Sequence, residues 1–342
     1  MSRSIASKHP MPVAKRWSTI LQGCNLPEIE KADPVSRWLV ISRACVISMT
    51  VTSGLIGLLF ALEDGAINWF FAFLSVVGLI AAHLSNNLIN DWTDVKMGVD
   101  TVDYPRAQYS THPIFGGLTT SGGLLKGAGI LLAVDAVIMV GLGLLRGWPV
   151  FAFAFSGLAL SMLYTVLLKR FALGELTAMI VWGPMMVGGT AYVSSGAVDL
   201  PVLIASLPYG LIVASVLIGK HMDKREADVS AGVRTLPVLL GNRRSAVLLK
   251  AASIVFFLLI GFLVVMKITG PYILVSLLSL MRLVKAWKVW GRPRPDAPPD
   301  KWTVWPLWYV GWAMYFNRQA GSFLILGLLL NVVVPKLVNL VL

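Results

Sequence analysis

Residues 87 to 100 read NLINDWTDVKMGVD and follow directly on a long apolar segment. On a helix, Asn87, Asp91 and Asp94 lie at positions i, i+4 and i+7, so all three side chains project from one face. Like charges one turn apart repel each other, and the C-terminal end of a helix disfavours anions further. Mg²⁺ would relieve both costs, because it is held by one or two carboxylates together with phosphate oxygens of a substrate. The stretch therefore predicts a metal–diphosphate site at a membrane surface.

The chain of 342 residues is too apolar for an ordinary soluble domain. Apolar side chains make up 56% of it, charged ones only 13%, and its mean hydropathy is +0.75. We predict an all-α membrane protein, a bundle of about nine transmembrane helices with two cytoplasmic acidic motifs. The apolar stretches that are long enough to span a bilayer lie near residues 37–62, 67–90, 121–145, 148–168, 171–194, 200–220, 244–266, 270–290 and 319–341.

The N-terminal segment predicts the orientation. Residues 1–17, MSRSIASKHPMPVAKRW, contain no apolar core of the kind that a cleaved signal peptide needs. We therefore expect residues 1–36 to form a cytoplasmic tail and residues 37–342 the transmembrane domain. Most of the 29 Lys and Arg residues then lie in the tail or in loops after even-numbered spans, as the positive-inside rule requires. This orientation predicts a protein of the cell inner membrane whose C-terminus lies on the side of the membrane opposite to the N-terminus.

The net charge of +12 is explained by this orientation and by contact with anionic lipids of the bilayer. Because no soluble basic module stands out, we expect no nucleic-acid partner. Cys24 and Cys45 fit neither a zinc pattern nor a disulfide framework, and the model places Cys24 on the reducing side of the membrane.

Two charged residues fall inside predicted spans. Arg43 lies about two turns into the first span, where its side chain either reaches the headgroups or faces an internal anion site. Asp135 is a lone carboxyl near the middle of the bilayer, and such residues are functional candidates by default. Because Asp135 lies far from the predicted metal site, a structural role is favoured for it.

The loop after the first acidic stretch, residues 101–123, reads TVDYPRAQYSTHPIFGGLTTSGG. Long loops in compact proteins tend to be functional or disordered. Its Arg106, Tyr109 and His112 are candidates for a lid over the metal site, and the alternative is a solvated loop.

A second charged cluster follows the sixth predicted span. Residues 219–241 read GKHMDKREADVSAGVRTLPVLLG, with carboxylates at Asp223, Glu226 and Asp228. Both clusters follow even-numbered spans, so they are expected on the same membrane face. The alternative to a shared binding site is that each cluster is only the solvent-exposed end of a loop. The cations that accompany them are Lys169, Arg170, Lys220, Arg225 and Arg234, with Tyr164 close to the first pair.

These parts suit an allylic diphosphate. Carboxylates hold Mg²⁺, the metal bridges diphosphate oxygens, and cations neutralise the charge that grows on the leaving group. The apolar bundle would then accept an isoprenoid tail.

At these residues the sequence resembles the UbiA superfamily of intramembrane prenyltransferases. The residues that match NxxNDxxDxxxGxD are Asn87, Asn90, Asp91, Asp94, Gly98 and Asp100, and those that match DxxxGxRTLxxxLG are Asp228, Gly232, Arg234, Thr235, Leu236 and Gly241. YT at 164–165, LGE at 173–175 and GP at 183–184 look like the menaquinone-forming dihydroxynaphthoate branch. The resemblance implies a nine-helix bundle, two Mg²⁺ ions, a polyprenyl diphosphate donor and an aromatic acceptor prenylated on carbon.

If the roles of the family's motif residues are assigned to the matching positions of this sequence, the resemblance implies a metal site of Asn87, Asp91, Asp94 and Asp228. The family usually has Asp where this chain has Lys224, so we expect Asp223 or Glu226 to serve instead. The residues expected to act in catalysis are Asp91, Asp94, Asp228, Lys169 and Arg225. Those expected to bind substrate are Asn87, Asn90, Arg106, Tyr109, His112, Tyr164, Arg170, Lys220 and Arg234.

The predicted function is Mg²⁺-dependent transfer of a prenyl group to an electron-rich aromatic acceptor of the quinone-precursor type. A first alternative is an isoprenoid cyclase, which uses the same metals and no acceptor. A second is an ion-coupled transporter, for which Asp135 is the clearest support.

Overall fold

The computed structural model describes residues 11–63, 65, 67–166, 171–300 and 302–341, and in these ranges every regular element is a helix. Short helices begin the chain and long ones follow. The first half contains α1 (Val13–Gly23), η1 (Ile29–Lys31), α2 (Pro34–Ile41), η2 (Ala44–Val46), α3 (Ile47–Glu63), α4 (Trp69–Lys96), α5 (Pro105–Tyr109), α6 (Ser121–Arg146) and α7 (Pro149–Val166). The second half contains α8 (Gly174–Ile180), η4 (Val181–Met185), α9 (Met186–Ser195), α10 (Leu200–Ala205), α11 (Leu207–Asp223), α12 (Arg225–Ser230), α13 (Leu236–Val265), η5 (Pro271–Ser279), α14 (Leu280–Trp290) and α15 (Tyr309–Val341).

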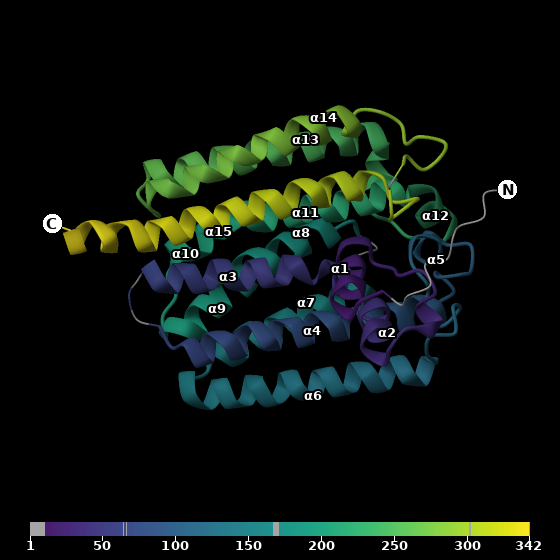
Figure 1. Cartoon of the computed structure of the whole chain (residues 1–342), viewed down its shortest axis with the longest axis horizontal. Coiled ribbons are helices and arrows are strands. Elements are labelled where there is room, and N and C mark those ends of the chain that lie inside the picture. The colour runs from purple at the N-terminus through teal and green to yellow at the C-terminus, as the bar shows by residue number, and fades with distance from the viewer. Residues whose placement is uncertain (1–10, 64, 66, 167–170, 301, 342) are drawn as a thin grey trace.

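The long helices form one bundle in which they run roughly parallel (Figure 1). Within the described ranges, seven segments are long and apolar enough to cross a membrane. The other two predicted spans coincide with α7, whose apolar part is shorter, and with η5 and α14, which together form a less regular rod. The all-helical membrane fold is thus confirmed, and the count of nine stays a prediction.

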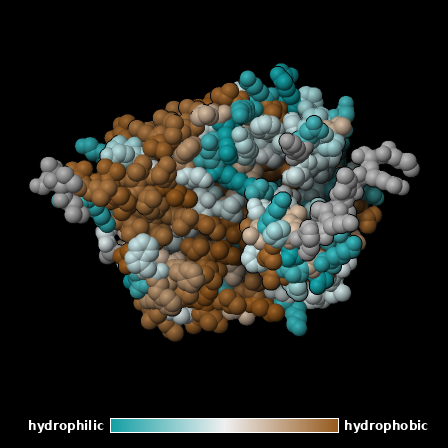
Figure 2. All heavy atoms as spheres, viewed as in Figure 1, coloured by the Kyte–Doolittle hydropathy of each residue, from teal (hydrophilic) through white to brown (hydrophobic). Residues whose placement is uncertain are grey.

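Side-chain burial explains how the bundle suits a bilayer. Its largest core cluster joins α3, α9, α11, α13 and α15 around fully buried side chains such as Tyr209, Phe256 and Phe316. Glycine lets two of these helices approach closely, because a Cβ on Gly57 would lie 2.4 Å from the carbonyl oxygen of Val187. The outside is also apolar over most of its length, whereas hydrophilic residues gather at one end (Figure 2). An apolar exterior of this kind suits contact with lipid.

We call the hydrophilic end the motif end, because it carries α5, α12 and the C-terminal turns of α4 (Figure 1). Helix α1 lies toward this end, and α15 finishes at the opposite one. The described part of the predicted tail is packed against the bundle, since Ile20 and Ile29 are buried together with Val40 of α2.

The first predicted span, 37–62, is not continuous. Helix α2 begins after Asp33, which accepts a hydrogen bond from the backbone N–H of Ser36 (2.9 Å), and it ends at Ile41. Arg43 then adopts a left-handed backbone conformation (φ 55°) before η2 and α3. The prediction that Arg43 lies within a helical span is therefore wrong. The break matters because it turns the Arg43 side chain toward α4.

The cysteines also differ from expectation. Cys24 and Cys45 form a disulfide with a Cα–Cα distance of 5.0 Å, which joins the end of α1 to η2, two residues after Arg43. Their sequence spacing contains no signal for this pairing. The contact arises because the tail folds back over the motif end.

Candidate active site

The first acidic motif occupies the last turns of α4. This helix starts at Trp69, where the Asn68 side chain accepts a hydrogen bond from the N–H of Phe71 (3.0 Å), and it ends before Gly98, whose φ is +70°. Asn87 is buried, and its side-chain N–H donates to the carbonyl oxygen of Ser42 (3.0 Å). The amide thereby ties α4 to the break beside Arg43.

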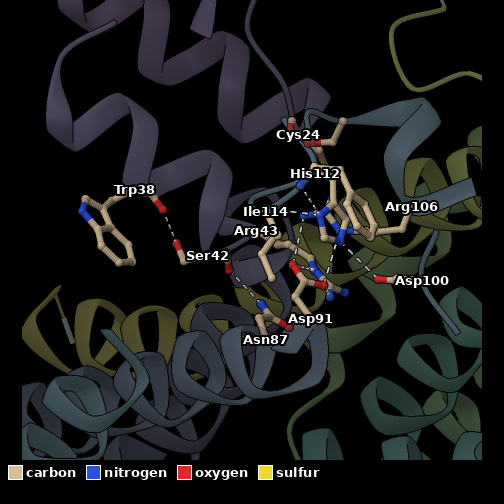
Figure 3. Close-up of polar contacts among 12 residues, drawn as sticks. Cys24, Trp38, Ser42, Arg43, Asn87, Asp91, Asp100, Arg106, His112 and Ile114 are labelled. Atoms are coloured by element: carbon tan, nitrogen blue, oxygen red, sulfur yellow. Dashed lines mark hydrogen bonds and ion pairs between the residues drawn. The ribbon is translucent and has the colours of Figure 1, made fainter. Parts of the chain in front are cut away.

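Asp91 is fully buried between two guanidinium groups (Figure 3). Arg106 donates from Nη2 to Oδ2 at 3.1 Å and from Nε to Oδ1 at 3.4 Å. Arg43 contacts the same carboxylate from the opposite chain segment, with Nε 3.4 Å from Oδ2 and Nη2 in an ion pair with Oδ1. One carboxylate thus holds two cations, and the carboxylates of Asp94 and Asp100 also interact with Arg43.

The segment after α4 is folded over the site. The side chains of Arg106, Tyr109 and His112 are 3%, 8% and 2% exposed, so a solvated loop is excluded for them. Whether they act as a lid over bound substrate stays a prediction.

His112 is held in a defined orientation next to Asp100. Its Nδ1 accepts hydrogen bonds from the backbone N–H groups of Ile114 (3.2 Å) and Phe115 (3.3 Å), which places the ring proton on Nε2. Nε2 lies 3.4 Å from Oδ2 of Asp100. Burial alone would raise the pKa of Asp100, but the His112 N–H and the positive charge of Arg43 outweigh it and lower the pKa below its ordinary value.

The second motif centres on Asp228, which is fully buried on α12. Its Oδ1 accepts a hydrogen bond from the Tyr104 hydroxyl (2.6 Å) and lies 3.6 Å from the Lys224 Nζ. The Lys224 ammonium also lies over the Tyr104 ring, 4.6 Å from its centroid. Burial and the Asp228 charge both raise the pKa of Tyr104, so its hydroxyl remains a donor.

The two motifs meet through one short segment. Tyr104 contacts Asp228, and Arg106, two residues later, contacts Asp91. The expectation that both clusters lie on the same face of the bundle is therefore confirmed by geometry, although more than a hundred residues separate them in the chain.

Other residues of the second cluster are placed differently from the expected ligand set. Both carboxylate oxygens of Asp223 accept hydrogen bonds, from the N–H groups of Tyr309 and Val310 (2.9 Å each), so Asp223 caps α15. Glu226 is exposed on the outer side of α12. Neither side chain takes the place of the carboxylate that Lys224 replaces.

The remaining predicted cations fall into two groups. Arg225 donates from Nε to the carbonyl oxygen of Pro237 (3.1 Å) and so ties α12 to α13, and Arg234 is exposed. Lys169 and Arg170 lie outside the described residues, as does the side chain of Tyr164.

A cavity of about 1110 Å³ runs from the motif end into the bundle. Near the motif end its lining includes four of the predicted substrate-binding residues: Asn87, Asn90, Tyr109 and Lys220. Farther in, apolar side chains such as Leu79, Met186 and Val213 dominate. The arrangement offers polar and cationic groups at one end and an apolar chamber behind them.

Sequence reasoning missed Tyr104 and underrated Arg43. Tyr104 stands in the unusual Tyr-Pro-Arg run of the loop, which was a usable signal. The sequence also did not indicate the buried pair of Glu175 and His221, in which Glu175 Oε1 and His221 Nδ1 are 2.7 Å apart. No spacing in the sequence indicates this contact.

The described residues fit a magnesium ion that also takes phosphate oxygens. No group of three or more His, Cys, Asp or Glu side chains converges among them, so a cage made of protein alone is not present there. Mg²⁺ does not need one, because it binds through one or two carboxylates, waters and substrate phosphates. The Oδ2 of Asp228 is buried without a hydrogen-bond partner in the described part, as expected of an oxygen that receives a cation on ligand binding.

Comparisons with known proteins agree with this geometry. The model of the UbiA prenyltransferase family matches residues 50–317. A UbiA homologue from Aeropyrum pernix K1 is similar in structure, with a TM-score of 0.62 at 18% identity over 83% of this chain and 96% of that one. A UbiA homologue from Archaeoglobus fulgidus bound to GPP and Mg²⁺ gives 0.59 at 13% identity, over 84% and 99%.

A structure of digeranylgeranylglyceryl phosphate synthase gives a TM-score of 0.57 at 18% identity, over 87% of this chain and 98% of that chain. No curated protein sequence matches the chain. At sequence identities of 13% to 18%, the structural matches show a similar fold and nothing more.

Proposed function

The chain belongs to the UbiA prenyltransferase family, and we propose that it transfers a prenyl group from a prenyl diphosphate to an electron-rich aromatic acceptor within the membrane, with Mg²⁺ as cofactor. The observation that carries the proposal is that Asn87 and Asn90 of the first motif and Lys220 of the second charged cluster line one end of a large apolar cavity. Tyr104 and Arg106 join the buried carboxylates of the two motifs at the same end of the bundle. A diphosphate needs the charged end, and a prenyl tail needs the chamber.

The proposed metal ligands are Asn87, Asp91, Asp94 and Asp228. When bound, Mg²⁺ would supply positive charge that stabilises the diphosphate leaving group as the carbon–oxygen bond breaks. The Archaeoglobus fulgidus homologue holds this ion together with GPP, which supports the same cofactor here.

Arg43 and Arg106 are proposed to exchange partners when substrate arrives. Without ligand, both guanidinium groups neutralise Asp91. Guanidinium groups match the geometry of phosphate oxygens well, so the two can turn to the diphosphate while Asp91 turns to the metal. The exchange keeps the buried charges compensated before and after binding.

The remaining cations of the site add to this grip. Lys220 lines the cavity mouth, and Lys224 places a buried positive charge beside Asp228. We keep Arg225 and Arg234, together with Lys169 and Arg170, as proposed contributors. Asp223 and Glu226 are left out of the proposed metal site, because one caps a helix and the other faces outward.

The apolar lining would shield the allylic cation from water while an acceptor ring carbon attacks it. The carbon–oxygen bond breaks first, and diphosphate leaves with the electron pair. The ring carbon then forms the new carbon–carbon bond to the cation, and the ring proton passes to the released diphosphate or to a base on a loop. The YT, LGE and GP residues favour a quinone precursor of the dihydroxynaphthoate type, as in menaquinone synthesis. We propose the motif end as the cytoplasmic one and the inner membrane as the location, so the Cys24–Cys45 disulfide at this end would have to persist in a reducing compartment.

The test is turnover by purified protein in Mg²⁺ with labelled prenyl diphosphates and a panel of aromatic acceptors, read by mass spectrometry. The proposal predicts a prenylated aromatic product that disappears without Mg²⁺ and falls at least a hundredfold in Asp228→Asn. The matched control is Asp103→Asn, which changes an exposed carboxyl between α4 and α5, next to Tyr104, and should keep parental turnover. A hydrocarbon formed from donor alone would instead establish the cyclase, and absence of both products would refute the proposal.

A further inference from the structure

One carboxyl in the cavity differs from the other polar groups of the lining. Several polar side chains inside the bundle are paired: Asn86 accepts from Ser161 (2.6 Å), and Ser75 lies 3.2 Å from Thr190, hydroxyl to hydroxyl. Asp135 also lines the cavity, and no hydrogen bond or ion pair reaches its carboxyl from the residues that the structure describes.

Asp135 faces inward from α6. The lipid side of this helix carries Val137 and Leu144, which are 73% and 78% exposed, whereas Asp135 is turned toward α4. Space for the carboxyl exists because residue 78 is glycine: a Cβ there would lie 3.1 Å from Oδ1 of Asp135. The carboxyl therefore occupies a place that a larger residue on α4 would narrow.

The position of Asp135 along the cavity can be read from α4. Gly78, beside Asp135, and Asp91, at the diphosphate end, lie on this one helix, so the two levels are separated by roughly 20 Å at 1.5 Å per residue. Apolar lining continues beyond Asp135 with Leu142, Val150 and Phe153. The carboxyl thus lies on the cavity wall between the motif end and the apolar lining behind it.

A carboxyl without a protein partner must keep water as its partner. An apolar tail that passes Asp135 would remove that water and provide no hydrogen bond in return, which is costly whether the carboxyl is ionised or protonated. A shorter tail that ends before Asp135 leaves the water in place. Tail length then decides whether the penalty arises.

We propose that Asp135 sets an upper limit on the length of the prenyl donor, so that the enzyme uses donors whose tails end on the motif side of this carboxyl. The proposal rests on the proposed function, and it assigns Asp135 a role in specificity, in place of the structural role favoured from sequence. Asp135 is a specificity residue and takes no part in the transfer itself.

The experiment compares dimethylallyl, geranyl, farnesyl, geranylgeranyl and longer diphosphates with the parent protein and with Asp135→Leu. Binding in Mg²⁺ without acceptor and kcat/KM with acceptor are both measured. In Asp135→Leu the ratio of kcat/KM for long donors to kcat/KM for short donors should rise at least tenfold. The rise should come from a higher kcat/KM for the long donors. The control Val137→Leu changes the lipid face of the same helix and should keep the parental ratio.

A structural role for Asp135 predicts another result. If the carboxyl stabilised the bundle, Asp135→Leu would lower the melting temperature, whereas the proposal predicts an equal or higher one because a half-buried carboxyl without a protein partner is removed. Asp135→Asn, which is polar and uncharged, serves as a second variant and should retain the preference for short donors.

The outcomes separate the two proposals. If the parent binds and transfers prenyl groups but Asp135→Leu keeps its ratio of long to short donors, the length limit is refuted and the proposed function stands. A parent that already prefers the longest donors also refutes the limit. If the parent binds no prenyl diphosphate at all, both proposals fall.

Discussion

Asp91 is the most constrained charge of the candidate site. It is fully buried and compensated by Arg43 and Arg106, which come from segments on either side of it in the chain. Such a carboxylate serves two purposes: it holds the ligand-free site together, and it keeps two guanidinium groups ready for an anion. Its loss therefore affects stability as well as activity.

Replacing Asp91 by alanine should lower the stability of the fold by about 3–5 kcal/mol, because two buried guanidinium groups lose their counter-charge. Thermal unfolding in detergent, followed by the fluorescence of the tryptophans, measures this. Asp94→Ala is the comparison, since Asp94 is only partly buried and should lose activity with a smaller loss of stability. Equal melting temperatures for Asp91→Ala and the parent would contradict the burial argument.

Asp100 and His112 make a pH-dependent contact at the same end. The pKa of Asp100 is lowered from its ordinary 3.8, so its ionised form contributes stability at every pH above that value. The contribution is lost as the pH falls through the lowered pKa. The melting temperature of the parent should therefore fall more steeply than that of Asp100→Asn as the pH is lowered from about 5 toward 3. Parallel curves for the two proteins would show that the His112 contact adds nothing.

At this scale the sequence predicted residue types better than partners. The pattern from Asn87 to Asp100 correctly indicated a charged site at the end of α4. It did not indicate that Arg43 would pair with Asp91, because that contact depends on a backbone break which no hydropathy pattern reveals. Likewise, the hydrogen bond from Tyr104 to Asp228 depends on a long-range fold.

Among the elements, the segment around α5 joins the two motifs. At its start, the side chains of Tyr104 and Arg106 point in different directions: Tyr104 contacts Asp228 of the second motif, and Arg106 contacts Asp91 of the first. The sequence singled out this loop by its length and its Tyr, Pro and Arg content, but the burial of its side chains came only with the structure. A segment held at both motif carboxylates is well placed to respond when a ligand takes over either contact.

The disulfide is the second feature at this scale. It closes a loop with a sequence separation of 21 and joins α1 to the break that orients Arg43. A loop of this length predicts a stabilisation of about 3 kcal/mol in the chain-entropy model. The double variant Cys24→Ser with Cys45→Ser should have a lower melting temperature than the parent. A thiol reductant should lower the melting temperature of the parent but not that of the double variant.

The control for the disulfide is the response of the double variant to reductant, which should be nil. Peptide mass mapping without reduction should find residues 24 and 45 on linked peptides. Free thiols at both positions in the non-reduced protein, with no effect of reductant on its melting temperature, would contradict the linkage.

For the whole molecule, composition and hydropathy predicted most of what was found. The apolar runs are real helices, and seven in the described ranges meet the criteria for a span. Boundaries were less accurate: α13 begins at Leu236 and α15 at Tyr309, both well before the predicted starts. Hydropathy windows miss such ends, because polar turns that extend beyond the bilayer are stabilised by packing and capping, as Asp223 caps α15.

The position of the site also follows from whole-chain topology. Two helices that end on the same face bring their C-terminal motifs to one end of the bundle, and this could be inferred from the parity of spans. The cavity behind them, by contrast, depends on how the side chains of many helices pack, which sequence patterns do not specify.

We propose that carboxylates from both motifs hold one magnesium diphosphate, and titration calorimetry measures this binding without relying on turnover. Mg²⁺ with geranyl thiolodiphosphate, which resists cleavage, is titrated without acceptor into folded parent, Asp94→Asn, Asp228→Asn and the control Asp103→Asn. Either motif variant should weaken binding at least tenfold, while the control should bind like the parent. Parental affinity in Asp94→Asn or in Asp228→Asn would show that the motif concerned does not hold the ligand, and would contradict the account.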